Sequence, residues 1–200
     1  MTVLSIRPVL ADTWVPRASL VRDIALSVTG AIAVGVLAQV SVPVWPVPIT
    51  GQTLGVMVVG AALGARRGAH ALLLYLLLGL AGMPWFANFT GGMAAIAKPS
   101  FGFIIGFIPT AYVIGRLAER RWDRHQWLSF AAFGIASVIP FLFGVPYMWW
   151  MLHQAGTTLS LAATLNTGVT PFILGGVVKM ILGVAIISAL WRFTTPTHRR

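Results

Sequence analysis

The chain has 200 residues, of which 58% are hydrophobic and only 9% are charged. Soluble globular domains are roughly 45–50% apolar and about 25% charged, so a soluble domain of this length could not bury so much apolar surface. The composition excludes a soluble domain and indicates an integral membrane protein, and the formal net charge of +10 has to be explained in that setting.

Six uncharged apolar runs follow one another along the chain. A bilayer core about 30 Å thick needs about 20 residues of helix, and as few as roughly 17. The second and third runs are short by this measure and rich in glycine. No run alternates as a barrel strand does, so each backbone must satisfy its own hydrogen bonds as a helix. We predict an all-α integral membrane protein with six transmembrane helices: Ile24–Val42, Ile49–Ala65, Ala69–Trp85, Phe101–Ala118, Trp127–Leu152 and Val169–Trp191.

The basic residues predict the orientation of these helices. Twelve of them flank the chain start and the ends of the even-numbered runs, whereas the odd-numbered exits hold only Lys98. By the positive-inside rule both termini are cytoplasmic. We therefore expect a cytoplasmic segment over 1–21, one membrane domain over 22–192 and a cytoplasmic tail over 193–200. The charge is then explained by anionic lipid of the bilayer, and no nucleic acid is expected as a partner.

Several kinds of catalytic or energy-coupling motif are missing. The four acids lie outside the runs or at the margin of the first, so no intramembrane proton relay is visible. The chain has no G-x-x-x-x-G-K-[ST] phosphate loop, no G-x-S-x-G elbow and no H-E-x-x-H zinc helix. It has no cysteine, and no cofactor or metal is expected. This pattern favours a binding subunit that is energised from elsewhere, and not an enzyme.

Lys179 is the charged residue within the last run. It lies near mid-membrane, where a lysine costs on the order of 2.5–3.5 kcal/mol on insertion scales. It is expected to face the bundle interior, where one reading is a lysine satisfied by backbone carbonyls or hydroxyls. The other reading is a cation that awaits an anionic ligand, because no acid lies well inside any of the six runs. Gly175 and Gly176 precede it and leave space beside the helix.

The two longest outer connections are candidates for a ligand pocket. The stretch from Val42 to Val56 contains three prolines and then Gln52, while the stretch from Gly79 to Phe103 contains Asn88, Thr90 and a glycine pair. Small residues, amides and aromatic rings are what an apolar pocket with a few polar anchors requires.

Small residues also form a stripe on the first run. The stripe includes Ala31 and Gly35, spaced as a small-xxx-small pair that lets helices approach closely. Such a surface serves packing within the bundle or docking of an external partner.

Four motifs occur in a characteristic order: PVPITGQTLGV at Pro46–Val56, LGARRGAHALLLYLLLGLAGMPWFA at Leu63–Ala87, PSFGFIIGF at Pro99–Phe107 and the lysine of the last run. With these motifs the chain, over about residues 20–192, resembles the BioY family of biotin-specific S components, the substrate-binding subunits of energy-coupling-factor (ECF) transporters. The resemblance implies a six-helix S-component fold that binds biotin near its outer face. It also implies two ATPase subunits and a coupling transmembrane subunit that docks on the small residues of the first helix, and some family members occur without a dedicated energising module.

Carried over residue by residue, the resemblance places Lys179 and Thr90 at the substrate, with Asn88 nearby. The chain departs from the family pattern at two places. Gly176 stands where the family usually has the acid of a D-x-x-K arrangement, and KPSFGF replaces the G-P-[TS]-G-G-[YF] loop, with Lys98 and Phe101 in place of glycines. Loss of the acid removes one acceptor for the ureido N–H groups of biotin. Lys98 is either a second cation for the carboxylate or an exposed loop lysine.

The resulting prediction is a multi-pass protein of the bacterial inner membrane that captures biotin and delivers it inward, with an energising module or alone. Lys179 anchors the carboxylate, Asn88, Thr90 and Gln52 donate and accept hydrogen bonds, and the rings of Trp85, Phe86 and Phe101 pack on the ligand. One alternative is transport of another small carboxylated vitamin or precursor, for which Gly176 leaves room. A second is an intramembrane enzyme that acts on a lipid with Lys179 as base, but it would need a partner nucleophile or metal ligand that the sequence does not show.

Overall fold

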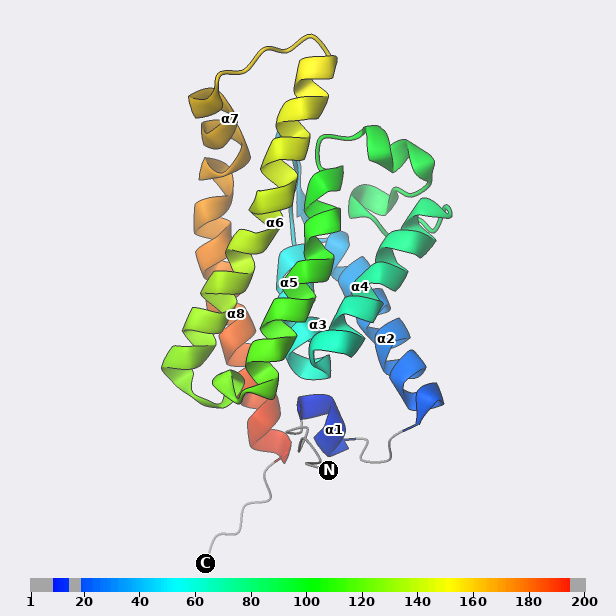
Figure 1. Cartoon of the computed structure of the whole chain (residues 1–200), viewed down its shortest axis with the longest axis vertical. Helices are drawn as coiled ribbons and strands as arrows, with labels where there is room; N and C mark the ends of the chain where they lie inside the picture. The colour runs from blue at the N-terminus through cyan, green and yellow to red at the C-terminus, as the bar shows by residue number, and fades with distance from the viewer. Residues whose placement is uncertain (1–8, 15–18, 195–200) are drawn as a thin grey trace, which may run out of the picture.

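The computed structural model describes residues 9–14 and 19–194, and they form a helical bundle (Figure 1). The prediction of a mostly helical protein is confirmed. A pair of two-residue strands and three short 3-10 helices complete the chain. The α-helices are α1 Leu10–Trp14, α2 Leu20–Ala38, α3 Gln52–Leu63, α4 Ala65–Leu80, α5 Phe101–Glu119, α6 Gln126–Gln154, α7 Leu161–Gly168 and α8 Thr170–Thr194. The strands are β1 Ser41–Val42 and β2 Ile49–Thr50, and the 3-10 helices are η1 Ala87–Phe89, η2 Met93–Ala97 and η3 Trp122–Arg124.

Each of the six predicted runs corresponds to a helix, but not all of these helices are equally long. Four are long and apolar enough to cross a membrane: α2, α5, α6 and the continuous stretch Leu161–Thr194 that holds α7 and α8. At about 1.5 Å per residue, the 12 residues of α3 and the 16 of α4 extend about 18 Å and 24 Å, short of a bilayer core about 30 Å thick.

The second run is not helical over its whole predicted length. Ile49 and Thr50 pair as strand β2 with Ser41 and Val42 of β1, and the helix begins only at Gln52. Three prolines precede this point and disfavour helix. Irregular backbone at membrane depth is tolerated where it is buried in protein or lines a cavity, and Val47 and Thr50 are indeed buried.

A single glycine joins α3 to α4. Gly64 has φ +84°, a left-handed conformation that side chains rarely adopt. The carboxylate of Glu119, at the end of α5, accepts a hydrogen bond of 2.9 Å from the Ala65 N–H at the start of α4. The basic pair Arg66 and Arg67 therefore lies in the first turn of α4 and not in a loop between helices.

Helix α5 is the centre of the bundle and packs against α3, α4 and α6 (Figure 1). Small residues permit the close approach: a side chain added at Gly60 would come within 2.8 Å of the Ala111 backbone. Helix α8 packs against α3 and α6 on the far side. This arrangement leaves the space between α3, α5, α6 and α8 to be filled by side chains or by a ligand.

Helix α1 packs under one end of the bundle, against α3 and α8 (Figure 1). Leu10 and Ala11 are buried there. Asp12 forms ion pairs with Arg22 and, at 2.9 Å, with Arg67. Burial alone would raise the pKa of Asp12, but hydrogen bonds from Arg67 and Arg22 outweigh it and hold this pKa below its ordinary value.

Candidate functional site

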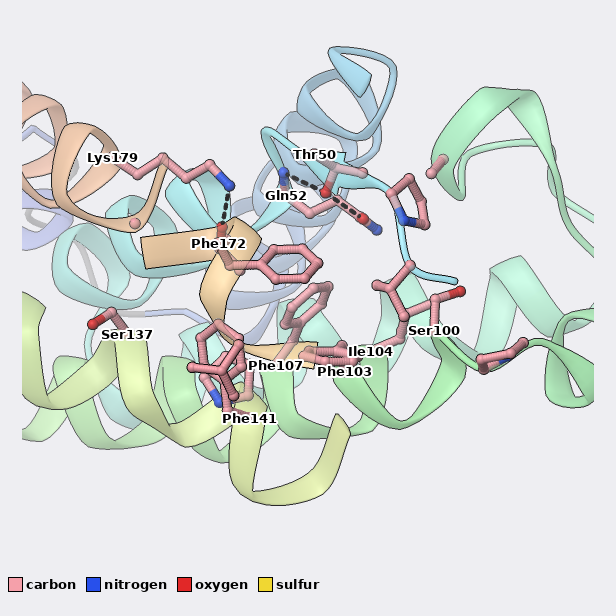
Figure 2. A pocket seen from close by; sticks show the side chains of 18 of the residues that line it. Thr50, Gln52, Ser100, Phe103, Ile104, Phe107, Ser137, Phe141, Phe172 and Lys179 are labelled. Carbon is pink, nitrogen blue, oxygen red and sulfur yellow. Dashed lines mark hydrogen bonds between the residues drawn. The ribbon is translucent and has the colours of Figure 1, made fainter. Parts of the chain in front are cut away.

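An apolar cavity of about 660 Å³ lies between α3, α5, α6 and α8 (Figure 2). The extended segment before α3 and the loop that holds η1 and η2 contribute the rest of its lining. The volume is within the range of small-molecule sites, roughly 300–1,000 Å³. Lys179 and Ser137 lie toward one end of the cavity and Ser100 toward the other, with phenylalanine rings between them (Figure 2).

Lys179 lies on α8 and its half-buried side chain extends into the cavity. Its Nζ donates a hydrogen bond of 3.1 Å to the Thr53 hydroxyl on α3 (Figure 2). The ion pairs within residues 9–14 and 19–194 join arginines to Asp12, Asp23 and Glu119, and none includes Lys179. This bond is of the kind expected for a lysine that is satisfied by hydroxyls within the protein. It engages one of three N–H donors, however, and leaves the charge without a carboxylate.

Gln52 begins α3 and lies at the centre of a buried hydrogen-bond network. Its amide N–H donates to the Tyr75 hydroxyl at 2.7 Å, and its amide oxygen accepts from the Thr50 hydroxyl at 2.8 Å. The Tyr75 hydroxyl in turn donates to the Trp85 carbonyl at 3.1 Å. Gln52 thus links α3 to α4 and to the loop between α4 and α5. One N–H and one lone pair of its amide stay available to a ligand.

Aromatic rings from three helices form one wall of the cavity (Figure 2). Phe103 of α5 lies 5.6 Å from Phe141 of α6 and 6.1 Å from Phe172 of α8, between ring centroids. Phe141 and Phe172 are 5.8 Å apart. Such tilted and offset contacts hold the rings in place. These three residues were not predicted from the sequence, because an apolar side chain in a membrane helix carries no signal that separates a ligand wall from the core.

The loop between α4 and α5 brings three predicted residues to the cavity: Phe86, Asn88 and Thr90. Phe86 N–H donates to the Thr90 carbonyl at 2.9 Å, which closes a tight loop around η1. Asn88 adopts φ 59° at its tip, a conformation for which asparagine is favoured over most residues. The Thr90 hydroxyl donates to the Ala87 carbonyl at 3.0 Å and keeps its lone pairs free to accept.

The structure places two other predicted residues, Trp85 and Phe101, outside the cavity lining. The Trp85 indole N–H donates to the Tyr75 carbonyl at 2.9 Å, and its ring packs against Gly35. Phe101 is buried against Tyr147, with centroids 5.9 Å apart. Both rings therefore support the walls of the bundle and do not face a ligand in this conformation.

Gly176 and Lys98, the two departures from the family pattern, both line the cavity. A side-chain carbon added at Gly176 would meet nothing within 4 Å, so the position that usually holds the family acid is open space here. Lys98 follows η2 at the rim and its side chain is exposed. The cavity thus has a half-buried cation within and an exposed one at its rim.

The predicted docking stripe on α2 faces inward. Ala31 is fully buried, and a side chain added at Gly35 would meet Cβ of Trp85 at 3.1 Å and its ring at 3.4 Å. Neither residue can contact a partner in this conformation, because both serve packing of α2 on the rest of the bundle. The exposed face of α2 carries a second set of small residues at the same four-residue spacing: Ala25, Thr29 and Ala33.

Comparisons with known proteins agree with this architecture. The BioY family matches residues 9–195. The biotin transporter BioY of Rhizobium etli is 37% identical over 175 residues, which cover 82% of this chain and 90% of that protein. Biotin transporter BioY of Thermotoga maritima is 35% identical over 159 residues, 79% of this chain and 88% of that protein.

A solved structure is similar as well. The crystal structure of the S-component for biotin from an ECF-type ABC transporter superposes with a TM-score of 0.68 at 26% identity, covering 88% of this chain and 95% of that chain. The chain therefore belongs to the BioY family of multi-pass cell-membrane transporters, which are not enzymes, and it has the S-component fold.

Proposed function

We propose that this chain is the biotin-binding S component of an ECF transporter, which captures biotin at the outer face of the bacterial inner membrane and delivers it inward. Two things support the proposal. The relatives are named as biotin transporters, and the cavity has the size and lining that a small, mostly apolar acid requires.

The position of Lys179 is the observation that carries this proposal. A half-buried ammonium in an apolar cavity, bonded to one hydroxyl, selects a ligand with an anionic group and an apolar body. Biotin has a carboxylate on a short alkyl chain, joined to a fused ring system with a polar ureido group. Its charge can pair with Lys179, and charge-assisted hydrogen bonds are about twice as strong as neutral ones.

The remaining contacts follow from this anchor. The Phe86 ring and the wall of Phe103, Phe141 and Phe172 pack on the alkyl chain and the fused rings. Asn88, Thr90 and Gln52 exchange hydrogen bonds with the ureido group, and Gly176 provides room beside them. Trp85 and Phe101 act on the ligand only through the walls that they support.

The membrane topology is proposed as six crossings with both termini in the cytoplasm. The membrane domain extends over 22–192, between a segment of 1–21 and a tail of 193–200. Helix α1 and the last turns of α8 lie at the same end of the bundle (Figure 1), as an even number of crossings requires. The extended segment before α3 adds length to the shortest of the six proposed crossings, and Arg66 and Arg67 lie at the α1 end through the contact of Arg67 with Asp12.

The chain is proposed to work with a coupling transmembrane subunit and two ATPase subunits. It lacks a phosphate-binding loop of its own, and the solved S-component belongs to an ECF-type ABC transporter. Because Ala31 and Gly35 are buried, we assign docking of the coupling subunit to the exposed face with Ala25, Thr29 and Ala33. Small side chains there allow a partner helix to approach closely.

Equilibrium binding of labelled biotin to the purified protein tests the proposal. We expect saturable binding at submicromolar biotin, loss of that binding in Lys179→Ala, and retention in Lys98→Ala. Copurification of the coupling and ATPase subunits with the tagged chain tests the assembly. An absence of binding at millimolar biotin would contradict the assigned substrate.

A second candidate function is transport of another small carboxylated vitamin or precursor. The observation that favours it is Gly176, where the cavity is open instead of holding an acid. Displacement of labelled biotin by a panel of small carboxylated vitamins separates the two: a competitor that binds more tightly than biotin would replace biotin as the substrate.

A further inference from the structure

The wall of the cavity is thin between α6 and α8. Val138 of α6 and Ile173 and Val177 of α8 line the cavity, yet they are exposed by 55%, 57% and 44%. A side chain that both lines a cavity and is exposed at the surface of the bundle forms a wall one side chain thick. We call these three residues the lateral mouth.

Near the lateral mouth the Phe141 and Phe172 rings connect the two helices, with centroids 5.8 Å apart, but two glycines close to them leave space. A side-chain carbon added at Gly134 of α6 would meet only the Met180 sulfur, at 3.8 Å, and one added at Gly176 of α8 would meet nothing within 4 Å. In the proposed topology the exposed sides of α6 and α8 face lipid at this depth. The lateral mouth therefore faces the hydrocarbon of the bilayer and not water.

We propose that the lateral mouth admits a long-chain fatty acid from the bilayer, whose carboxylate binds Lys179 while its tail leaves between α6 and α8. Charge and polarity along the path match this ligand. The inner end of the path has the Lys179 ammonium, which is bonded to the Thr53 hydroxyl and to none of the described acids. The outer end has only aliphatic side chains.

The lengths along α8 are compatible with an extended tail. Ile173 precedes Lys179 by six residues, a rise of about 9 Å toward the α7 end of the helix. A carboxylate at Lys179 thus has its alkyl chain directed toward the outer leaflet through the lateral mouth. A phospholipid fits this path less well, because its large polar headgroup would have to cross an opening of bare aliphatic side chains to reach the cation.

The consequence is competition between the bilayer and the vitamin for one ammonium. Fatty acid and biotin both need Lys179, but only the fatty acid needs the lateral mouth. The inference rests on the Lys179 cavity and its lateral opening, and it does not require biotin to be the natural substrate.

The test uses the purified full-length protein in phosphatidylcholine nanodiscs, with tritiated dodecanoate as the probe. We expect saturable dodecanoate binding that displaces labelled biotin and that is lost in Lys179→Met. Val138→Trp should close the lateral mouth and weaken dodecanoate binding about tenfold more than it weakens biotin binding, a difference of about 1.4 kcal/mol.

Ile135→Trp is the matched control. Ile135 lies on the same helix and is 49% exposed, but it does not line the cavity, so this variant should bind both ligands as the native protein does. Methyl dodecanoate, which lacks the charge, should not displace biotin. If Val138→Trp binds neither ligand, Ile173→Trp on the opposite side of the mouth is held to the same expectation.

Three results would overturn the inference: dodecanoate binding that survives in Lys179→Met, biotin that is not displaced by dodecanoate, or equal dodecanoate affinity in the Trp variants of the mouth and of Ile135. A failure of the proposed function looks different. In that case native protein does not bind biotin, while saturable, Lys179-dependent dodecanoate binding persists and is measured directly.

Discussion

Replacement of Lys179 by methionine should remove one specific interaction, that between the ammonium and the ligand carboxylate. Methionine keeps an unbranched apolar stem of similar size, so packing against α3 changes little. In the structure the ammonium donates to Thr53 at 3.1 Å and is half-buried. A hydrogen bond to a charged group in such a setting is worth about 1.5–3 kcal/mol. At 1.4 kcal/mol per tenfold change, biotin affinity should fall by about 10- to 150-fold.

The assay is a thermodynamic cycle that pairs the protein variant with a change in the ligand. Calorimetry compares biotin with biotinamide, which has no charge, on native protein and on Lys179→Met. We expect native protein to bind biotinamide about 10- to 150-fold more weakly than biotin, and Lys179→Met to bind the two ligands equally. Lys98→Met is the control: an exposed ion pair is worth about 0–1 kcal/mol, so its effect should stay below about sixfold.

Additive losses in this cycle would contradict a contact between Lys179 and the carboxylate. If Lys179→Met weakens biotin and biotinamide by the same factor, the lysine does not contact the carboxylate and acts only through the shape of the cavity. If Lys98→Met instead removes the discrimination between the two ligands, the rim lysine is the anchor.

Three further predictions concern the cavity, the docking face and the α1 end. Gly176→Leu should abolish biotin binding, because the new side chain enters the open space of the cavity. Thermal stability should stay equal or rise, since helix propensity improves by about 0.5–1 kcal/mol. Labelled-biotin binding and thermal unfolding measure the two effects, and unchanged binding would contradict the placement of the ligand. Ala33→Trp should preserve biotin binding but prevent copurification of the coupling subunit. Ala31→Trp should instead unfold the protein, because Ala31 is fully buried. An intact complex with Ala33→Trp would rule out docking on the exposed face of α2. Asp12 has a pKa held below its ordinary value, so its ion pairs stabilise the fold above about pH 4 and are lost as the pH falls through the lowered pKa. Thermal unfolding as a function of pH should show a loss of stability in acid for native protein and a smaller loss for Asp12→Asn. Identical profiles would contradict a stabilising role of the Asp12 ion pairs.

The helices could be predicted from the sequence because hydrophobic runs and charged boundaries are direct consequences of the bilayer. All six predicted runs contain a helix, and the family resemblance is confirmed. The start of the second run was predicted too early. Its first residues pair with β1 as strand β2. A segment at membrane depth need not be helical where it lines a cavity. A hydropathy pattern does not show whether a segment lines a cavity.

The polar part of the cavity was predictable, whereas of its aromatic lining only Phe86 was predicted. Lys179, Gln52, Asn88 and Thr90 stand out from an apolar background, and the structure brings all four to one cavity. Phe103, Phe141 and Phe172 do not stand out, since any ring in a membrane helix reads as lipid contact or core.

The buried and exposed faces of α2 could not be distinguished from the sequence. Ala31 and Gly35 share their four-residue spacing with Ala25, Thr29 and Ala33, and only the packed structure distinguishes the buried set from the exposed set. Spacing alone establishes that a helix face is small, while the neighbours of that helix determine whether the face is available to a partner.

A structure of the protein with biotin bound would test directly whether Lys179 binds the carboxylate of biotin. It should show a carboxylate oxygen of biotin within about 3.2 Å of the Lys179 Nζ, with the fused rings against Phe103 and Phe172. The account would be contradicted by a carboxylate that lies at Lys98 or in solvent while Lys179 remains bonded only to Thr53.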